Sequence, residues 1–427
     1  MTGSARFSLG LARMMGASTL RQTRARLRRV PSPRAHGAEL TEFDPTDAGD
    51  PAAVDAWYAR LHEGGPVHYN RERRIWIISR YEDVRGSARA HDTLSSADSI
   101  TPARNNRLPM MIAMDRPEHS RLRRIVARQF THEAIGRRRP SVEHIVREAF
   151  DAVPAGEPFD GVAHLSGPIP VEVIAELLGI PREDRARFRD WSDRVVVAFG
   201  VVTYSALARE IGSIWRSTIA LRAYLTAAIA ERRTAPRDDL LSHLIASSEE
   251  GRLTEEEVFW FAFLLLVAGN ETTTSLIGGM LLAFARNPDQ YDRVREDPSR
   301  IPAVVEESLR YVSPIQGLYR TALTDHAVDG ATIPAGERVL LAFGAANRDP
   351  RRYPEPDRFL ADRDASDHIG FGSGIHFCLG AQLARLEATV FLEQLVERAS
   401  RVELAGEPVW TGNPSLRGVA SLPVRLA

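Results

Sequence analysis

Apolar residues in this chain recur mainly three or four positions apart, which is the spacing of amphipathic helices. The longest such patterns cover residues 118–130, 140–153, 169–178 and 205–232. Strand-like segments are short, and the clearest lies within residues 67–81, where Trp76-Ile77-Ile78 follows a polar turn. We find no segment repeated at a fixed period of about 20 to 50 residues. The pattern predicts a mainly helical protein with small β-sheets, an α+β arrangement.

The clearest helix begins at Thr254 and is expected to end near Arg286, before Asn287-Pro288. Thr254 and Glu257 form a capping-box pattern, in which each side chain bonds the other residue's backbone N–H. The segment that follows is apolar on all sides, so the helix should be buried. At about 1.5 Å per residue, its roughly thirty residues span about 45 Å. We expect this helix to be the central axis of the fold.

A polar stretch, Ala268 to Ser275, interrupts this buried helix. Gly269 costs about 0.5–1 kcal/mol relative to Ala within a helix, and a buried carboxylate such as Glu271 costs more unless it is paired. Thr and Ser hydroxyls can bond the carbonyl four residues earlier and open a groove for water or a small ligand. The alternative is a polar contact that fixes helix packing. The stretch alone does not decide between the two.

The composition is that of a soluble globular protein, with 427 residues, 44% hydrophobic, 26% charged and a net charge of −1. A near-neutral chain predicts no nucleic-acid or membrane-surface partner. The longest apolar run, Val258 to Gly269, is too short for a membrane span, so we expect no membrane span and a cytoplasmic location. The one cysteine, Cys378, excludes an internal disulfide, a four-cysteine iron–sulfur cluster and any multi-cysteine zinc site.

Residues 1–38 differ from the rest, because they carry many arginines and the first acidic residue is Glu39. Three interpretations are open: a transit peptide, a nucleic-acid- or lipid-binding tail, and a poorly ordered leader. A secretory signal is excluded, because the segment lacks an apolar stretch of about 7 to 15 residues. We favour the leader, since unpaired like charges resist compaction. The predicted organisation is an Arg-rich leader over residues 1–38 and one folded domain over residues 39–427.

Cys378 lies in the segment Phe371 to Gly380, just before an amphipathic helix that runs to about Val396. Glycines there permit a tight turn. A thiolate at a helix start gains from the helix dipole and from unpaired backbone N–H groups, which lower the pKa of the thiol, so this is a setting for a metal ligand. The alternatives are a buried structural cysteine and a dinucleotide-binding loop, but Phe377 stands where that loop requires its last glycine.

The run Phe371 to Gly380 matches the haem-binding signature F-x-x-G-x-[HR]-x-C-x-G, and through it the chain resembles the cytochrome P-450 family of haem-thiolate monooxygenases. Three further segments resemble motifs of that family: its oxygen-binding helix motif at Ala268–Thr273, its E-x-x-R helix at Glu307–Arg310, and its meander at Pro354–Phe359. The similarity extends from about Asp44 to the C-terminus. It implies a single triangular helical domain whose long central helix passes over haem b.

The resemblance also implies which residues hold the cofactor. Cys378 is implied as the thiolate ligand of the iron. The haem propionates need cationic partners. The other implied cofactor-binding residues are His119, Arg123, Arg320, Phe371, His376 and Gly380. His119 and Arg123 are four positions apart and so share a helix face. Arg116 stands where the family often has a second Pro, which affects only the local turn.

Further roles follow from the same resemblance. Glu271 and Thr272 are implied as the catalytic pair, with Thr272 holding dioxygen and a proton-delivering water, and Glu271 connecting that water to solvent. Glu307 and Arg310 are implied to form a buried structural pair that ties their helix to the meander. Losing one partner of such a buried pair should cost about 3–5 kcal/mol and prevent haem incorporation.

We therefore expect a monooxygenase that hydroxylates an apolar organic substrate with one oxygen atom from O2. The chain has no flavin or nicotinamide motif and no cluster cysteines, so a separate ferredoxin and its NAD(P)H reductase should supply the electrons. We expect the enzyme to be a monomer and the ferredoxin to dock near Cys378, with Arg80, Arg123 and Arg385 as candidate contacts. A non-catalytic haem-binding or recruitment protein with the same fold is the alternative.

The sequence does not identify the substrate. By resemblance, the pocket walls should come from residues 94–112, 188–208, 264–268 and 315–318, which are largely apolar. Asn105, Asn106 and Gln316 are the polar residues in these segments that could bind a hydroxyl or carbonyl group. Terpenoid, steroid, fatty-acyl, macrolide and aromatic substrates all fit such a pocket.

Overall fold

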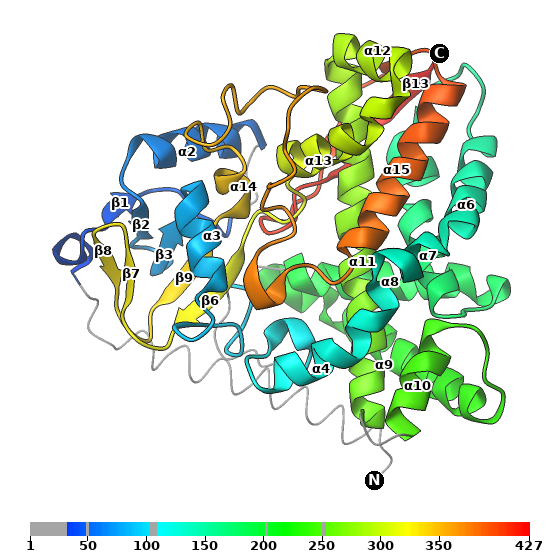
Figure 1. The fold of residues 1–427 in the computed structure, drawn as a ribbon, viewed down its shortest axis with the longest axis horizontal. Helices are drawn as coiled ribbons and strands as arrows, with labels where there is room; N and C mark the ends of the chain where they lie inside the picture. Colours follow the sequence, from blue (N-terminus) through cyan, green and yellow to red (C-terminus); the bar gives the residue numbers. More distant parts are fainter. Residues whose placement is uncertain (1–31, 48–50, 103–108, 201–203, 250–252) are drawn as a thin grey trace.

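The computed structural model describes residues 32–47, 51–102, 109–200, 204–249 and 253–427. The helices are α2 (Pro51–Glu63), α3 (Tyr81–Arg89), α4 (Glu118–Val126), α5 (His132–Gly136), α6 (Arg139–Asp151), α7 (Pro168–Leu177), α8 (Arg185–Gly200), α9 (Tyr204–Thr234), α10 (Leu240–Glu249), α11 (Glu255–Arg286), α12 (Pro288–Glu296), α13 (Ile301–Val312), α14 (Phe343–Ala346) and α15 (Ala381–Arg398). Most helices gather on one side of the molecule, and the main sheet lies on the other together with α2, α3 and α14 (Figure 1). The predicted class, mainly helical with small sheets, is confirmed.

The strands are short, as the sequence predicts. They are β1 (Glu39–Thr41), β2 (Val67–Asn70), β3 (Ile75–Ile78), β4 (Leu94–Ser95), β5 (Phe159–Asp160), β6 (Leu318–Ala322), β7 (His326–Val328), β8 (Ala331–Ile333), β9 (Arg338–Leu341), β10 (Val402–Leu404), β11 (Val409–Trp410), β12 (Val419–Ser421) and β13 (Pro423–Leu426). The main sheet has the order β1-β2-β3-β9-β6-β4. β2 and β3 are antiparallel, with Tyr69 opposite Trp76, which confirms the hairpin expected within residues 67–81. β6 is antiparallel to β9 and holds Arg320 opposite Val339, in a buried part of the sheet.

The central helix α11 follows the sequence prediction closely. Thr254 Oγ1 accepts the Glu257 N–H over 3.2 Å and Glu257 Oε2 accepts the Thr254 N–H over 2.7 Å, so the capping box is confirmed. The helix packs against α7, α13 and α15. By length and composition, α11 is the one helix within the described ranges that could cross a membrane. However, 67% of its most apolar 18-residue segment is buried inside the protein. This is the burial expected of a core helix.

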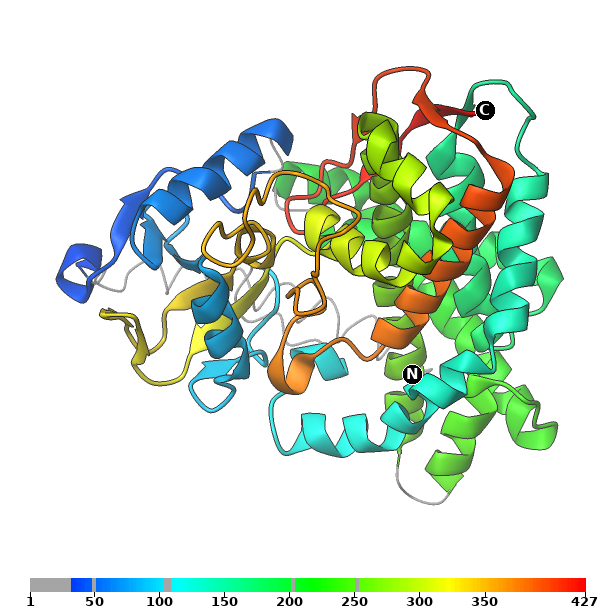
Figure 2. The same cartoon turned by 45° about the horizontal axis from the view of Figure 1, so that its top comes forward.

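Apolar cores of the helical part and of the sheet part flank the segment that carries Cys378. The larger core surrounds α11, and smaller cores lie on either side of the main sheet. In Figures 1 and 2 the loop before α15 lies between the helical part and the sheet part, with α4 beside it. Part of this loop, the turn η7 (Gly374–His376), contacts α3. Side chains from the helical part and from the sheet can therefore meet at the loop.

Most of the predicted leader, residues 1–31, lies outside the described residues. The last part of the 1–38 segment packs on the fold, because Pro33–His36 form the turn η1 and Ala38 is buried. Gly37 has a φ of +78°, and a Cβ there would lie 2.9 Å from the Gly330 carbonyl oxygen in the β7–β8 hairpin. Contacts with the domain thus begin before Glu39, and the exact boundary at residue 38 stays a prediction.

Candidate active site

The polar stretch of α11 has two different faces. Ala268 is exposed and Thr272 half-exposed, although the preceding turns of the helix are buried. The Thr272 hydroxyl donates to the Ala268 carbonyl oxygen over 2.7 Å. Asn270 is 3% exposed, and its side-chain amide donates to Ser192 Oγ on α8 over 3.2 Å. Both interpretations of this stretch therefore hold: one face is accessible to a small molecule, and the other fixes helix packing.

Two glycines shape the loop that carries Cys378. Gly372 and Gly374 have φ angles of +70° and +71°, a region that side chains rarely adopt. A Cβ on Gly374 would also lie 2.8 Å from the Ala88 carbonyl oxygen of α3. The Cys378 N–H donates to the Phe371 carbonyl oxygen over 2.9 Å and closes the loop. These contacts fix the backbone of Cys378 before the start of α15.

The pKa of the Cys378 thiol is raised, which corrects the expectation from its place before a helix. Burial is the largest cause, and it outweighs the Gly380 N–H and the charges of Arg123 and Arg385, all of which favour the thiolate. Desolvation disfavours the anion more than the helix start stabilises it. A buried thiol of this kind becomes a thiolate when a metal cation coordinates it.

Basic side chains from three elements converge beside the Cys378 loop. The rings of His119, on α4, and His376, in the loop, have centroids 4.3 Å apart. Burial is the main reason that the pKa of His376 falls to about 2, and the neighbouring charges of Arg320 and Arg123 lower it further. Burial likewise lowers the pKa of His119 to about 4 and the pKa of Arg320 to about 10. The structure thus brings together His119, Arg123, Arg320 and His376, the four basic residues among those implied to bind the cofactor.

This cluster is short of anionic partners. Within the described chain, Nδ1 of His119 and Nδ1 of His376 are buried without a hydrogen-bond partner. Arg320 is 4% exposed, and no acid in the described residues forms an ion pair with it. Asp115 acts on Arg320 only through its charge, since its carboxylate oxygens accept from the 95–96 segment. Two carboxylate groups, such as the propionates of haem, would supply the missing acceptors, so the residues present fit this cofactor.

Glu307 and Arg310 form the buried pair that the sequence predicts. Arg310 Nε and Nη2 donate to the two carboxylate oxygens of Glu307 over 2.6 and 2.9 Å, and both side chains are fully buried. The guanidinium also donates to the carbonyl oxygens of Asn347, Pro356 and Arg358. The last two carbonyls belong to the meander segment, so the pair does connect α13 to it.

The three arginines expected at a docking surface have partners within the protein or are partly buried, and their role in docking stays a prediction. Arg80 donates to a backbone carbonyl and pairs with Asp329. Arg385 forms a two-point pair with Glu306, at 2.6 and 2.8 Å. Arg123 is half-buried beside Cys378, where burial lowers its pKa. The partners of these side chains come from tertiary contacts, which charge counting along the sequence does not detect.

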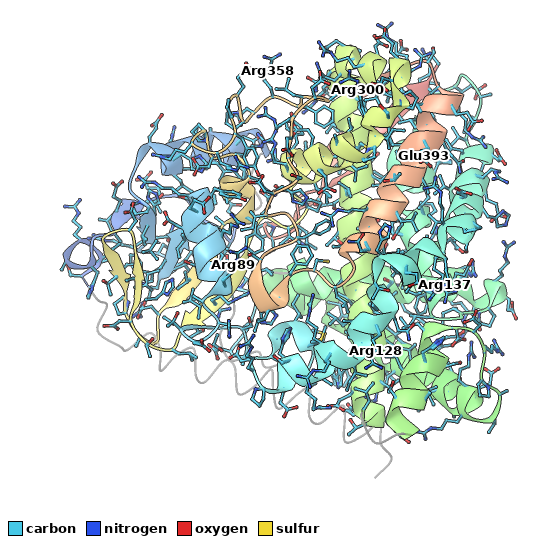
Figure 3. All side chains as sticks on the ribbon, in the orientation of Figure 1. Arg89, Arg128, Arg137, Arg300, Arg358 and Glu393 are labelled. Carbon is cyan, nitrogen blue, oxygen red and sulfur yellow. The ribbon has the colours of Figure 1, made fainter. Side chains whose placement is uncertain are left out.

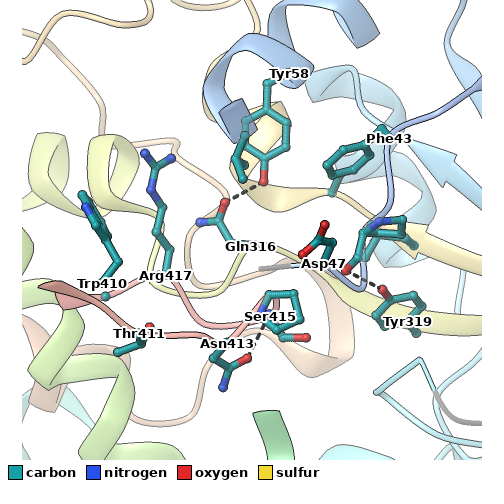
Figure 4. A pocket seen from close by; sticks show the side chains of 17 residues that line it. Phe43, Asp47, Tyr58, Gln316, Tyr319, Trp410, Thr411, Asn413, Ser415 and Arg417 are labelled. Carbon is teal, nitrogen blue, oxygen red and sulfur yellow. Dashed lines mark hydrogen bonds between the residues drawn. The ribbon is translucent and has the colours of Figure 1, made fainter. Parts of the chain in front are cut away.

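Gln316 is expected in the pocket wall but is already hydrogen-bonded at both ends. Its Oε1 accepts from the Tyr58 hydroxyl over 2.6 Å, and its Nε2 donates to the Ser313 carbonyl oxygen over 2.5 Å. Figure 4 shows the Tyr58–Gln316 bond at the edge of a small pocket beside the sheet. Gln316 is therefore a structural residue, not a group free to bind substrate. The other two polar candidates, Asn105 and Asn106, lie outside the described residues.

One group around Phe371 is not detectable from the sequence. Glu306 pairs with Arg385 and also lies 3.2 Å from His368 Nε2. The Arg385 guanidinium lies 4.8 Å from the centroid of the Phe371 ring. The three charged or polar residues come from α13, the loop before Phe371 and α15. No fixed spacing connects them, and only the tertiary structure brings them together.

Comparison with known proteins agrees with this geometry. The cytochrome P-450 family profile matches residues 204–302 and 301–419. A β-dihydromenaquinone-9 ω-hydroxylase of Mycobacterium tuberculosis is 40% identical over 390 residues, which cover 90% of this chain and 78% of that protein. The chain belongs to the cytochrome P-450 family. It is therefore a monooxygenase, and its cofactor is haem b, the iron protoporphyrin of this family.

Other cytochrome P-450 relatives extend the likeness over most of the chain. The monooxygenase PikC of Streptomyces venezuelae is 38% identical over 396 residues, 88% of this chain and 92% of PikC. The crystal structure of CYP109E1 from Bacillus megaterium in complex with testosterone has a TM-score of 0.81 and 33% identity, and the match covers 90% of this chain and 100% of that one. The expected fold, one helical domain with a long central helix, is thus confirmed.

Proposed function

We propose that this cytochrome P-450 hydroxylates an apolar organic substrate, with Cys378 as the iron ligand and a separate ferredoxin as the electron donor. The observation that carries the proposal is the convergence of four basic residues, short of anionic partners in the described chain, beside the Cys378 loop. Haem, when bound there, supplies the activation of dioxygen, which an axial thiolate promotes. The roles of the protein side chains follow from their contacts.

On the propionate side, His119, Arg123, Arg320 and His376 would hold the cofactor by charge-assisted hydrogen bonds. Ser96 Oγ lies 3.1 Å from His376 Nε2, which fixes the imidazole ring and leaves Nδ1 to face a propionate. An anion there would reverse the effect of burial on the pKa values of both histidines. The cluster would therefore both bind and orient the cofactor.

On α11, Thr272 would order a water for proton delivery. Its hydroxyl proton already points to the Ala268 carbonyl oxygen, so the lone pairs of Oγ1 remain to accept a hydrogen bond from that water. Glu271 is half-exposed and directly precedes Thr272 on the helix, where its carboxyl group would pass protons between solvent and the Thr272 water. Glu307 and Arg310 take no part in the chemistry and would keep the meander and the Cys378 loop in place.

The proposed substrate class rests on the apolar approach to Thr272. Leu264 lies one turn before the exposed Ala268 and Val267 directly before it; both are apolar and 9% exposed, at the border of the buried core. Among the relatives, one is named for dihydromenaquinone-9 and one is solved with testosterone. Both molecules are largely hydrocarbon, as is the surface that these side chains offer. Burial of such a substrate would supply most of its binding energy.

The proposed ferredoxin would dock on the face that carries the Cys378 loop. Arg124 and Arg128, four residues apart, are exposed there and pair with no acid among the described residues. Arg89 is exposed too and donates to Ser373 Oγ in the loop over 3.0 Å. Figure 3 shows Arg89 and Arg128 on the same face of the molecule. Exposed basic side chains around the cofactor loop suit an acidic electron carrier.

Turnover with a surrogate ferredoxin, its reductase and NAD(P)H tests the proposed reaction. Compounds are first selected from a diverse apolar panel by the low-spin to high-spin absorption change that they cause in the haem enzyme. We expect hydroxylated product from at least one selected compound, and none when O2 or ferredoxin is omitted. Binding of selected compounds without product from any of them would support the non-catalytic haem-binding alternative instead.

A further inference from the structure

The aromatic ring of Phe371 lies between two basic side chains. The Arg385 guanidinium carbon is 4.8 Å from the ring centroid, and the His368 ring centroid is 5.4 Å from it. The Phe371 carbonyl oxygen accepts the Cys378 N–H. The position of this one residue thus connects α15 and the segment at His368 to the backbone that carries the sulfur.

A single carboxylate holds both basic side chains. Glu306 on α13 accepts two hydrogen bonds from Arg385, at 2.6 and 2.8 Å, and its Oε2 lies 3.2 Å from His368 Nε2. His368 Nδ1 accepts the Gly370 N–H over 2.9 Å, which leaves Nε2 as the ring nitrogen nearest to Glu306. The pKa of Glu306 is about 2, because these two partners outweigh the effect of burial. The carboxylate therefore stays charged at neutral pH.

Solvent screens this group only weakly. The side chains of His368, Glu306 and Arg385 are 1%, 16% and 27% exposed. The charge of Arg385 acts on Cys378, where it favours the anionic sulfur. Glu306 carries the opposite charge in direct contact with Arg385, so removal of either charge changes the local electrostatic potential at the sulfur.

We propose that Glu306, His368 and Arg385 are positioning residues that hold Phe371 against the Cys378 loop and set the reduction potential of the haem iron. The inference rests on the proposed role of Cys378 as the iron ligand. Reduction adds one negative charge to the iron–thiolate unit. A nearby positive charge therefore favours the reduced state, and a nearby negative charge opposes it.

The midpoint potential of substrate-free holoenzyme, measured by spectroelectrochemical titration, tests the inference. We expect Arg385→Gln to lower the potential and Glu306→Gln to raise it, because the two substitutions remove opposite charges. The double variant should shift the potential less than either single one. Arg385→Lys, which keeps the charge, should stay close to the unmodified enzyme. Glu133→Gln is the control, since it removes the charge of Glu133 on α5, which forms an exposed pair with Arg137.

Shifts of the same sign in both single variants would overturn the inference, because loosening of the loop alone moves the potential in one direction. Shifts no larger than that of Glu133→Gln would overturn it as well. If one of the two neutral variants takes up no haem, the other is compared with Glu133→Gln, and a shift opposite to the expected one or no larger than that of the control counts against the proposal. Failure of the proposed function is distinct, because the unmodified enzyme would then lack the red-shifted Soret band of the reduced carbon monoxide complex.

Discussion

At the residue scale, surroundings rather than residue type decide the charge of buried acids here. Glu306 has two basic partners and a pKa of about 2. Glu387, on α15, is 1% exposed, and its Oε2 has no hydrogen-bond partner in the described residues. Burial alone raises the pKa of Glu387 to about 8. One acid is therefore charged and the other is protonated at neutral pH.

Glu387→Gln should stabilise the protein at pH 8 and have little effect at pH 4.5. The unfolded chain releases the Glu387 proton near its usual pKa of 4.5, whereas the folded protein keeps it to about 8. Stability is therefore lost as pH rises through this window, and the amide removes that loss. We expect the midpoint of thermal unfolding to rise by roughly 2 °C or more at pH 8. The exposed Glu397→Gln on the same helix is the control, and an equal gain at both pH values would contradict the pKa assignment.

Thr272→Ala should uncouple electron consumption from product formation. The variant keeps haem and substrate binding, since Thr272 contacts the Ala268 carbonyl and not the core. Without the hydroxyl the proton-delivering water is lost, and we expect hydroxylated product per NAD(P)H to fall by about tenfold or more as peroxide rises. Thr272→Ser should retain most of the coupling. Peroxide and product assays decide, and unchanged coupling in the alanine variant would remove Thr272 from the mechanism.

At the scale of elements, the site depends on close contact between the Cys378 loop and α3. Gly374 meets the end of α3 where no side chain fits, and its φ of +71° favours glycine as well. The loop continues into α15, while α4 supplies His119 and β6 supplies Arg320. The geometry of the cofactor site is therefore set by backbone contacts between elements far apart in the sequence.

Gly374→Ala should reduce the haem-bound fraction of purified protein severalfold. A methyl group 2.8 Å from the Ala88 carbonyl oxygen forces the loop away from α3, and the left-handed backbone adds strain. The absorbance ratio of the Soret band to the protein band measures haem content. Gly86→Ala, in the middle of α3 with no atom within 4 Å of the new methyl group, is the matched control and should keep full occupancy. Equal occupancy in both variants would contradict the proposed role of the contact.

The sequence predicted elements better than contacts between them. The capping box of Thr254 and the E-x-x-R pair are local patterns, and the structure has both. The long-range cluster of His119, Arg320 and His376 was expected only through the family resemblance, because burial and partners are decided by the fold. The pair of Arg385 with Glu306 and the bond of Gln316 with Tyr58 have no local pattern that predicts them.

At the scale of the whole molecule, the helical part and the sheet part meet at the cofactor loop (Figure 1), and the exposed Arg89, Arg124 and Arg128 lie on elements near it. The near-neutral net charge of −1 conceals this asymmetry. Arg124 and Arg128 can therefore attract an acidic carrier even though the protein as a whole has no strong charge. An association of this kind weakens as ionic strength rises.

Charge reversal at Arg128 should slow electron delivery without changing the haem site. We expect Arg128→Glu to lower the second-order rate of reduction by ferredoxin about tenfold at low salt, with the difference shrinking at high salt. Arg358→Glu is the control, since Arg358 is exposed and paired with Glu355 in the meander. Stopped-flow reduction measures both. If the Arg128→Glu variant is reduced by ferredoxin at low salt as fast as the unmodified enzyme, the docking surface lies elsewhere.

The bond between Cys378 and the haem iron is the central claim, and the absorption spectrum of the reduced, carbon monoxide-bound holoenzyme tests it most directly. We expect the unmodified enzyme to show the red-shifted Soret band that thiolate ligation produces. The Cys378→Ser variant should lose that band, because the chain has no other cysteine. An unmodified enzyme without the band, or a Cys378→Ser variant that keeps it, would contradict the account.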